Sequence, residues 1–242
     1  MKNLNSKMKM KKEIKIIGFD ADDTLWVNEP YYLETEKKFC ELLKEYHNSE
    51  SISKELFKTE MENLDIYGFG AKSFVLSMIE TTLKITEKEN SGYFIEKVLQ
   101  LGKELIHKPL VLLENVEDTL KTLKKKGYKL IVATKGDLLD QERKLRNSGL
   151  EEYFHHIEIM SNKKEDDYRK LIAHLDIKEE EFIMIGNSLK SDILPVINIG
   201  GQAIYIPYHT VWLHEQIDEE SIENNNFHKA ENISEVPSLI EK

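Results

Sequence analysis

The chain has 242 residues, of which 40% are hydrophobic, and its 34 basic and 44 acidic residues leave a formal net charge of −10. This length suits one large globular domain or a domain with a substantial insertion. The acidic balance disfavours a nucleic-acid backbone as partner, because such binding depends on Lys and Arg neutralising phosphates. The single cysteine, Cys40, excludes an internal disulfide. No apolar run is long enough to span a bilayer, so we expect no membrane partner and a cytoplasmic protein.

The stretch from residue 14 to residue 26 reads IKIIGFDADDTLW. Its apolar, β-branched start predicts a buried parallel strand over 14–19. Asp20, Asp22 and Asp23 follow at once. Open α/β sheets bind ligands beyond the carboxyl ends of their strands, and clustered carboxylates must find a cation or repel one another. We therefore interpret this strand end as a functional site, since a turn with a helix cap would account for only one Asp.

The segment from about residue 28 to residue 108 shows helical periodicity and no convincing strand. The first predicted helix covers 29–47, and a Gly-containing break at 67–70 separates the second from the third. The fourth is expected to begin at Thr86, which has the spacing of a capping box to Glu89. This pattern predicts an all-helical insert between the first strand and the rest of the sheet.

From Pro109 onward, predicted strands and helices alternate, which indicates a parallel sheet with helices on both faces. The further strands are expected at 128–133, 154–160, 182–185 and 202–206. Together with the first strand they make a doubly wound, five-stranded, Rossmann-like α/β sheet. The chain after Pro207 is typical of a polar, acidic tail with a short apolar patch.

Polar residues follow four of these strands, and in a parallel sheet all four strand ends should meet at one edge. In chain order they are Asp20 and Asp22, then Thr134 and Lys135, then Lys163 and Lys164, then Asn187 with Asp192 shortly after. Acids, a hydroxyl, cations and an amide suit phosphoryl transfer, which depends on positioning and charge neutralisation. Alone, Thr134 would suit a turn and the two adjacent lysines would be solvated charge. The order of the series is what favours a site.

The same residues resemble the motifs of the haloacid dehalogenase-like (HAD) superfamily. The first motif, Asp-x-Asp-x-Thr, is met by Asp20, Asp22 and Thr24; the second by Thr134; the third by Lys163, with Lys164 as the alternative; and the fourth by Asn187 and Asp192. Asn187 departs from the commoner Asp and so removes one possible anionic ligand. The resemblance covers about residues 14–25 and 109–206.

The resemblance implies a phosphatase that needs Mg²⁺. Asp20 would attack phosphorus and form an aspartyl-phosphate, and Asp22 would act as general acid and then general base. Thr134, Lys135 and Lys163 would bind the phosphate. The ligands of Mg²⁺ would be Asp20, the backbone carbonyl of Asp22, Asp192, and Asn187 nearby or through water.

A helical insert directly after the first motif also resembles the C1-type cap of this family. Residues 28–108 are then expected to form a cap domain over a core made of 1–27 and 109–242. Trp26, which leads into the hinge, and Phe69, in a loop between two cap helices, are expected to border the substrate, although core packing accounts equally well for Phe69. A cap that closes over the site would limit the partner to a small phosphorylated metabolite.

Other activities use the same core or the same residues. A nucleoside monophosphate phosphatase and a phosphosugar mutase both remain open. Carbon–halogen hydrolysis is disfavoured by Asp22, because a halide leaving group needs no proton. Phosphonate cleavage would need a Schiff-base lysine from the cap, and the spacing of Lys72 does not support it. A non-catalytic binding protein would have no need for the whole series of site residues.

Overall fold

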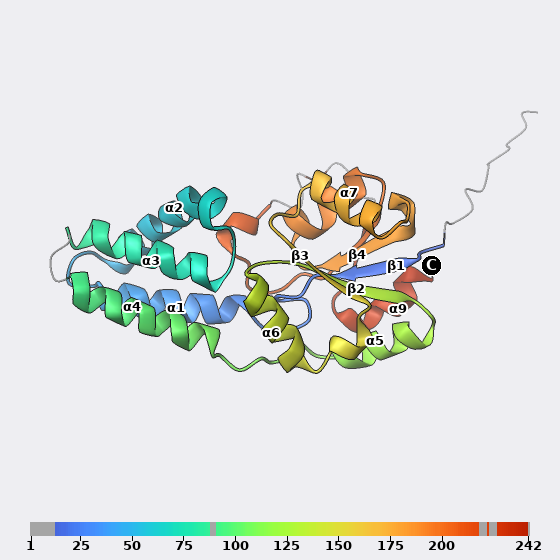
Figure 1. Ribbon diagram of the computed structural model, residues 1–242, viewed down its shortest axis with the longest axis horizontal. Helices are drawn as coiled ribbons and strands as arrows, with labels where there is room; N and C mark the ends of the chain where they lie inside the picture. Colours follow the sequence, from blue (N-terminus) through green and yellow to red (C-terminus); the bar gives the residue numbers. More distant parts are fainter. Residues whose placement is uncertain (1–12, 88–90, 218–221, 223–226, 242) are drawn as a thin grey trace, which may run out of the picture.

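The computed structural model describes residues 13–87, 91–217, 222 and 227–241. Its elements form an α/β part and an all-helical part that lie end to end (Figure 1). Residues 1–12 and 242, assigned to the core by the sequence, and Glu89 of the expected capping box lie outside the described residues. No helix in the described part of the chain combines the length and the apolar character needed to cross a membrane.

The α/β part is built on a parallel sheet with the strand order β3-β2-β1-β4-β5-β6. Its strands are β1 (Ile16–Phe19), β2 (Lys129–Lys135), β3 (His156–Met160), β4 (Phe182–Gly186), β5 (Gln202–Tyr205) and β6 (His228–Lys229). The predicted doubly wound parallel sheet is confirmed, but the predicted count of five strands is wrong. The sixth strand is only two residues long, so it carries no periodicity, and it exists through its pairing with β5.

Helices cover both faces of the sheet. They are α5 (Val116–Lys125), α6 (Leu138–Ser148), α7 (Glu165–His174), α8 (Leu194–Asn198) and α9 (Val236–Ile240). On one face Phe19, Leu120 and Val236 share a buried cluster, and on the other Met184 packs with Val196. The central strands β1 and β4 are buried along their whole length, which is why their sequences are continuously apolar.

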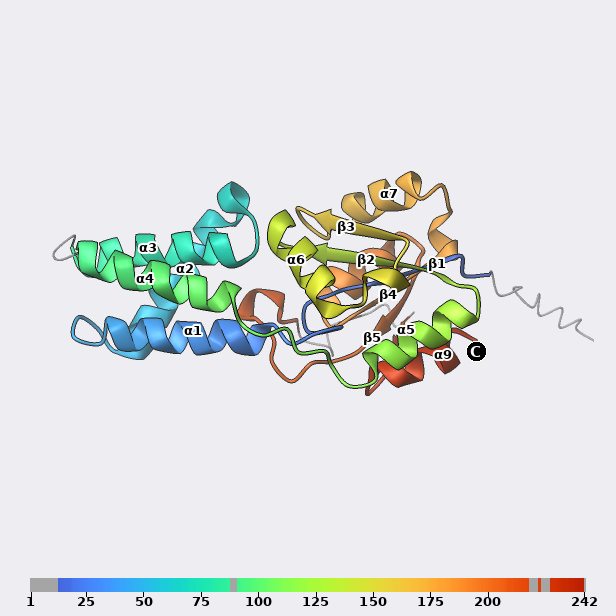
Figure 2. The same ribbon diagram turned by 60° about the horizontal axis from the view of Figure 1, so that its bottom comes forward.

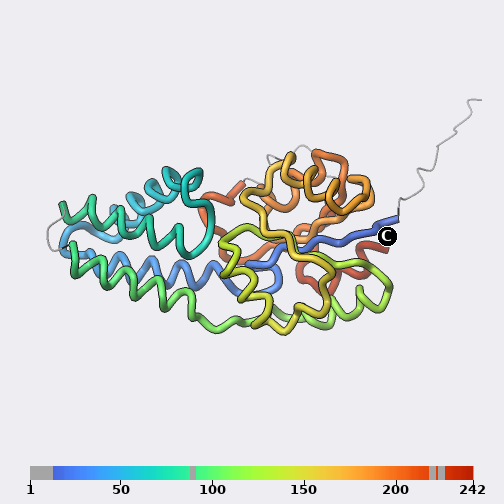
Figure 3. The backbone as a smooth tube through the Cα atoms, viewed as in Figure 1, coloured from blue at the N-terminus to red at the C-terminus, as the bar shows by residue number. Residues whose placement is uncertain are grey.

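In residues 28–87 and 91–108 the structure shows four helices, which pack around a hydrophobic cluster of their own that includes Phe39, Leu56 and Met78. They are α1 (Glu29–Leu42), α2 (Ser49–Tyr67), α3 (Ala71–Ile85) and α4 (Ser91–Ile106). The backbone enters this part after β1 and returns to the sheet after α4 (Figure 3). The prediction that Thr86 begins a helix is wrong: it ends α3, where its hydroxyl donates to the Thr82 carbonyl at 2.9 Å.

Candidate active site

The carboxyl ends of β1, β2 and β4 lie side by side at the edge of the sheet that faces the helical part (Figure 2). Asp20 is the first residue beyond β1, and its N–H donates to the Ile185 carbonyl at 2.8 Å, so its backbone stays joined to β4. Thr134 is buried near the end of β2, and Asn187 directly follows β4. The topology therefore brings these strand-end residues to one place, as a parallel sheet requires.

Lys163 bridges two carboxylates at this edge. Its Nζ lies 2.5 Å from Asp20 Oδ1 and 2.6 Å from Asp192 Oδ1, and its side chain is buried. Of the two adjacent lysines, Lys163 is therefore the one at the site. Lys164 is exposed and caps α7, where its N–H donates to the Asp167 carboxylate.

The positive charge of Lys163 does not balance the negative charges of Asp20 and Asp192. Burial raises the pKa of Asp20 to about 7, against the lowering effect of Lys163 beside it. Burial also lowers the pKa of Lys163, but the attraction of Asp192 and Asp20 outweighs it, so that pKa rises above its ordinary value. One ammonium serves two buried carboxylates. The excess negative charge would be neutralised by a further cation.

Asp192 is held tightly against the end of β4. Its Oδ2 accepts the N–H of Ser188 at 2.9 Å. It lies in a π-helical turn, Leu189–Ile193, a distortion that occurs frequently at functional sites. A Cβ on Gly186 would come within 2.3 Å of Asp192 Oδ2, so only glycine leaves room for the carboxylate here.

Asp22 is fixed by three donors, two of which the sequence did not indicate. Its Oδ1 accepts from Trp26 Nε1 at 2.7 Å and from Lys144 Nζ at 2.9 Å, and its Oδ2 accepts from Gln141 Nε2 at 2.7 Å. Gln141 and Lys144 are three residues apart on α6, the helix that follows the second motif. This spacing places both side chains on one face of the helix, and it is the feature of the sequence from which their shared contact with Asp22 could have been predicted. Trp26 is almost fully buried beneath Asp22 and does not line the cavity that contains Asp20.

Oxygen atoms gather beside Asp20. The outer atom of the Asn187 carboxamide that faces Thr24 lies 3.3 Å from both Asp20 Oδ2 and the carbonyl oxygen of Asp22. The orientation that satisfies the hydrogen bonds places the nitrogen there, so that it donates to Thr24 Oγ1, Asp20 Oδ2 and the Asp22 carbonyl. A carboxylate oxygen and a carbonyl oxygen thus converge beside Asp192, and oxygens of these kinds are the ligands that Mg²⁺ prefers. The donor set here therefore fits Mg²⁺.

Lys135 is held by a network that involves a residue from far along the chain. Its Nζ lies 2.6 Å from Glu215 Oε1, 2.9 Å from Ser191 Oγ and 4.2 Å from the centre of the Phe69 ring. Glu215 also accepts from Ser188 Oγ at 2.5 Å and from Ser191 Oγ at 2.6 Å. Burial acts to raise the pKa of Glu215, but Lys135 and these hydrogen bonds outweigh it and lower that pKa to about 2.

Glu215 belongs to the segment after β5 that the sequence indicated to be part of a polar tail. The structure instead places this segment against the active site and the helical part. The Trp212 ring contacts the Phe69 ring edge-on at 6.2 Å, and His214 lies beside both rings. No local sequence pattern predicts the contact between Trp212 and Phe69, because the two residues are about 140 positions apart in the sequence.

A cavity of about 410 Å³ lies between the strand ends and the helical part. Asp20, Asp22, Thr134, Lys163 and Asp192 line its floor. The wall formed by α1 and α2 contributes aromatic and acidic side chains, among them Tyr32, Phe57, Glu36 and Glu60. Burial and the neighbouring Glu36 raise the pKa of Glu60 to about 8, although a hydrogen bond from Trp212 opposes the rise. The wall above the floor is therefore rich in carboxyl groups.

The helical part also touches the core beside this cavity. Lys72 Nζ lies 3.0 Å from both carboxylate oxygens of Asp137, so the one lysine considered for Schiff-base chemistry is engaged in an ion pair. Gly70 has a φ of 108°, and a Cβ there would lie 3.0 Å from the Asp137 nitrogen. The loop before α3 can approach the start of α6 this closely only with glycine.

A family model described as haloacid dehalogenase-like hydrolase matches residues 14–200 of the chain. The chain belongs to the haloacid dehalogenase-like hydrolase family. A crystal structure of such a hydrolase from Xanthomonas campestris is 34% identical, with a TM-score of 0.84 over 94% of this chain and 91% of that one. The predicted family and the prediction of a hydrolytic enzyme are both confirmed.

Two more distant similarities bear on the activity of this HAD-like hydrolase. Glyceraldehyde 3-phosphate phosphatase from Pyrococcus furiosus is 29% identical over 128 residues, which are 51% of this chain and 50% of that protein. The match thus spans about half the length of this curated relative. The HAD-hydrolase YfnB from Bacillus subtilis, whose structure is described as bound to magnesium and as revealing interdomain movement, shares the fold at 14% identity, with a TM-score of 0.63 over 96% of this chain and all of that one.

Proposed function

We propose that this hydrolase is a phosphatase that cleaves a small phosphomonoester in a Mg²⁺-dependent reaction through an aspartyl-phosphate on Asp20. The observation that carries the proposal is the position of Lys163 Nζ, in contact with both Asp20 and Asp192 at the floor of the cavity. A carboxylate attacking a phosphate dianion must overcome charge repulsion, and a buried cation at the nucleophile reduces it.

In the first half of the reaction, an Asp20 carboxylate oxygen forms a bond to phosphorus while the bond to the leaving oxygen breaks. Asp22 gives that oxygen a proton. In the second half, Asp22 takes a proton from water, whose oxygen bonds to phosphorus and releases Asp20 and inorganic phosphate. Lys163 and the Thr134 hydroxyl hold the phosphate oxygens. The donors from Trp26, Gln141 and Lys144 hold the Asp22 carboxyl group in one orientation for both proton transfers.

The residues proposed to hold Mg²⁺ are Asp20, Asn187, Asp192 and the carbonyl of Asp22. The convergence of Asp20 Oδ2 and the Asp22 carbonyl oxygen on the Asn187 carboxamide, each at 3.3 Å, supports Asp20 and the carbonyl, and a half-turn of the carboxamide would present the Asn187 oxygen to the same ion. Both oxygens of Asp192 already accept a hydrogen bond, so it would bind through its remaining lone pairs or through water. When bound, the ion would neutralise charge on the phosphate and fix its orientation.

We propose that residues 28–108 act as a cap domain over a core made of residues 1–27 and 109–242, and that the substrate is a small metabolite. The cavity of about 410 Å³, enclosed between core and helices, supports a leaving group of metabolite size. Glu36 in its wall would repel a second anionic group on the substrate. Glu60, whose pKa is raised to about 8, is mostly protonated at neutral pH and could donate a hydrogen bond to an uncharged leaving group. The P. furiosus relative is named for glyceraldehyde 3-phosphate, whose leaving part is small and uncharged.

The test is phosphate release from 4-nitrophenyl phosphate and from a panel of phosphorylated metabolites. Wild-type protein with Mg²⁺ should turn over at least one of them, and excess chelator should abolish that turnover. Asp20→Asn should lower kcat by about 10³-fold or more, because an amide is a far weaker nucleophile. Circular dichroism would establish that the variant is folded. Release at the wild-type rate from Asp20→Asn would refute the assignment of the nucleophile.

A further inference from the structure

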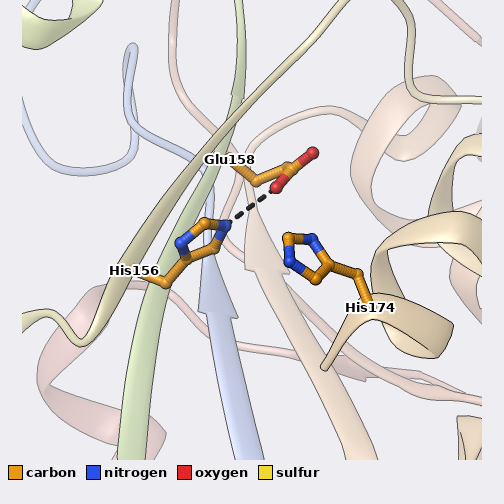
Figure 4. Close-up of side chains that lie close together, drawn as sticks. All are labelled: His156, Glu158 and His174. Carbon is orange, nitrogen blue, oxygen red and sulfur yellow. Dashed lines mark hydrogen bonds and ion pairs between the residues drawn. The ribbon is translucent and has the colours of Figure 1, made fainter. Parts of the chain in front are cut away.

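Three side chains that can bind a metal converge on the edge strand β3 and the helix after it (Figure 4). His156 and Glu158 are two residues apart on β3 and so project from the same face of the sheet. His174 is the last residue of α7. One ligand atom from each side chain lies within 4.8 Å of the other two.

The fold explains why these residues meet away from the catalytic edge. His156 begins β3, four residues before Met160 ends it, which is ~13 Å along a strand. A crossover helix runs back antiparallel to the strands, so the end of α7 returns to the beginning of β3. The catalytic residues, in contrast, follow the ends of the strands. The cluster is therefore separate from the oxygen-rich site at Asp20.

The chemistry of the cluster also differs from that of the Asp20 site. Two imidazoles and one carboxylate match the ligands that Zn²⁺ takes in proteins, whereas Mg²⁺ prefers oxygen ligands alone. His156 Nε2 already lies 2.8 Å from Glu158 Oε2, and the two imidazole rings are 5.6 Å apart at an angle of 78°. Ligand atoms around a tetrahedral Zn²⁺ are about 3.4 Å apart. The three side chains are partly exposed, so they are free to close that small difference by rotation.

We propose that His156, Glu158 and His174 form a second metal site, which binds one Zn²⁺ ion and leaves a fourth position for water. The position of His174 favours a cation, because the carboxyl end of a helix carries partial negative charge. Since the ligands come from both β3 and α7, binding would join the edge strand to its covering helix. Zn²⁺ should then stabilise the folded state without any role in phosphoryl transfer.

The experiment titrates metal-stripped protein with Zn²⁺ by calorimetry and measures the thermal unfolding midpoint with and without the ion. Zn²⁺ can also enter the site at Asp20, so the quantity that decides is the difference between wild type and variants. His174→Ala is the main variant, because His174 is exposed at a helix end. His156→Gln is the second, and circular dichroism verifies that both are folded. His155→Ala removes an exposed histidine that precedes β3 and is not a member of the cluster, and it serves as the matched control.

We expect wild type and His155→Ala to bind one more equivalent of Zn²⁺ than His174→Ala and His156→Gln, or to bind that equivalent about tenfold or more tightly. The Zn²⁺-induced rise of the unfolding midpoint should shrink in the same two variants. Equal stoichiometry, affinity and midpoint shift in all four proteins would overturn the proposal, whatever the phosphatase assays show.

Discussion

At the scale of single residues, the site depends on side chains that hold the reacting groups in place. The Asp22 carboxylate is held in one orientation by Trp26, Gln141 and Lys144, which donate three hydrogen bonds to its two oxygens. Without these donors the side chain could rotate. Lys144 also donates to Asn28 at 2.8 Å, where the chain enters the helical part. Its position thus connects the proposed general acid to the start of the proposed cap.

Replacing Lys144 should affect poor leaving groups more than good ones. In Lys144→Ala, Asp22 loses a hydrogen-bond partner and is misaligned for proton transfer to the leaving group. An alkoxide leaving group needs that proton, whereas 4-nitrophenolate is a good leaving group and needs it much less. We expect kcat/KM for an alkyl phosphate to fall by about 10- to 100-fold and that for 4-nitrophenyl phosphate by much less. Arg146→Ala, an exposed change on the same helix, should leave both values unchanged. Equal losses on the two substrates would contradict a role through Asp22.

Glu215 should make stability depend on pH in the acid range. Its pKa is lowered from 4.5 to about 2 in the folded protein, so its stabilising effect is fully present above pH 4.5 and is lost as pH falls towards 2. The effect corresponds to about 3 kcal/mol at neutral pH. The difference in unfolding free energy between wild type and Glu215→Gln, measured in urea, should therefore shrink from pH 7 to pH 3. Glu142→Gln, at an exposed position, is the control; a difference for Glu215 that does not change with pH would refute the assignment.

At the scale of elements, the loop between α2 and α3 is the point where the helical part meets the catalytic edge. Phe69 lines the cavity, covers the Lys135 ammonium at 4.2 Å and contacts Trp212. Gly70 then lets the backbone approach the start of α6. The loop is thus in a position to affect both substrate choice and closure.

Phe69→Ala should change the order of preference among small phosphoesters. Removing the ring takes away the cation–π contact of Lys135 and enlarges the cavity. The loss of stability should stay at ~1 kcal/mol, because the ring is only partly buried. We expect relative kcat/KM values across a metabolite panel to shift by about tenfold. Tyr93→Ala, an exposed aromatic change in α4, should leave the order intact. An unchanged order in Phe69→Ala would remove Phe69 from the substrate site.

At the scale of the fold, the proposed nucleophile, Asp20, lies at the bottom of a cavity that the core and the helical part enclose together. Charged residues at the edge of the sheet line the bottom of the cavity. Residues of α1 and α2 and of the segment around Trp212 line its other walls. A covered site excludes water from the phosphoenzyme and strengthens the interactions of its charges. It also admits only substrates that fit beneath the helices.

The wild-type protein should therefore discriminate by the size of the leaving group. We expect kcat/KM for a folded phosphoprotein to be at least about 100-fold lower than for a small phosphomonoester, because a protein surface cannot enter the cavity. Phosphate release from both substrates under the same conditions measures this ratio. A short phosphopeptide with the same phosphorylated residue serves as the intermediate case. Efficient turnover of the phosphoprotein would contradict the proposal of a closing cap.

The α/β class and the series of strand-end residues follow from the sequence, and the motif residues resemble one family, which the family match confirmed. These features are encoded locally: a buried parallel strand is a continuous apolar run, and the motif residues follow such runs directly. The order of strands along the chain then implies that Asp20, Thr134 and Asn187 share one edge, because parallel strands end on the same side. That much follows from period, spacing and chirality rules alone.

Which side chains complete the site depends on tertiary packing. The motif pattern favoured Lys163 but left Lys164 as the alternative. In the structure Lys163 contacts Asp20, whereas Lys164 is exposed and caps α7. The contact of Glu215 with Lys135 and the pairing of β6 with β5 join segments with no shared local signal. These contacts join segments that lie far apart in the sequence. They depend on how the elements pack against one another, and no local sequence pattern encodes that packing.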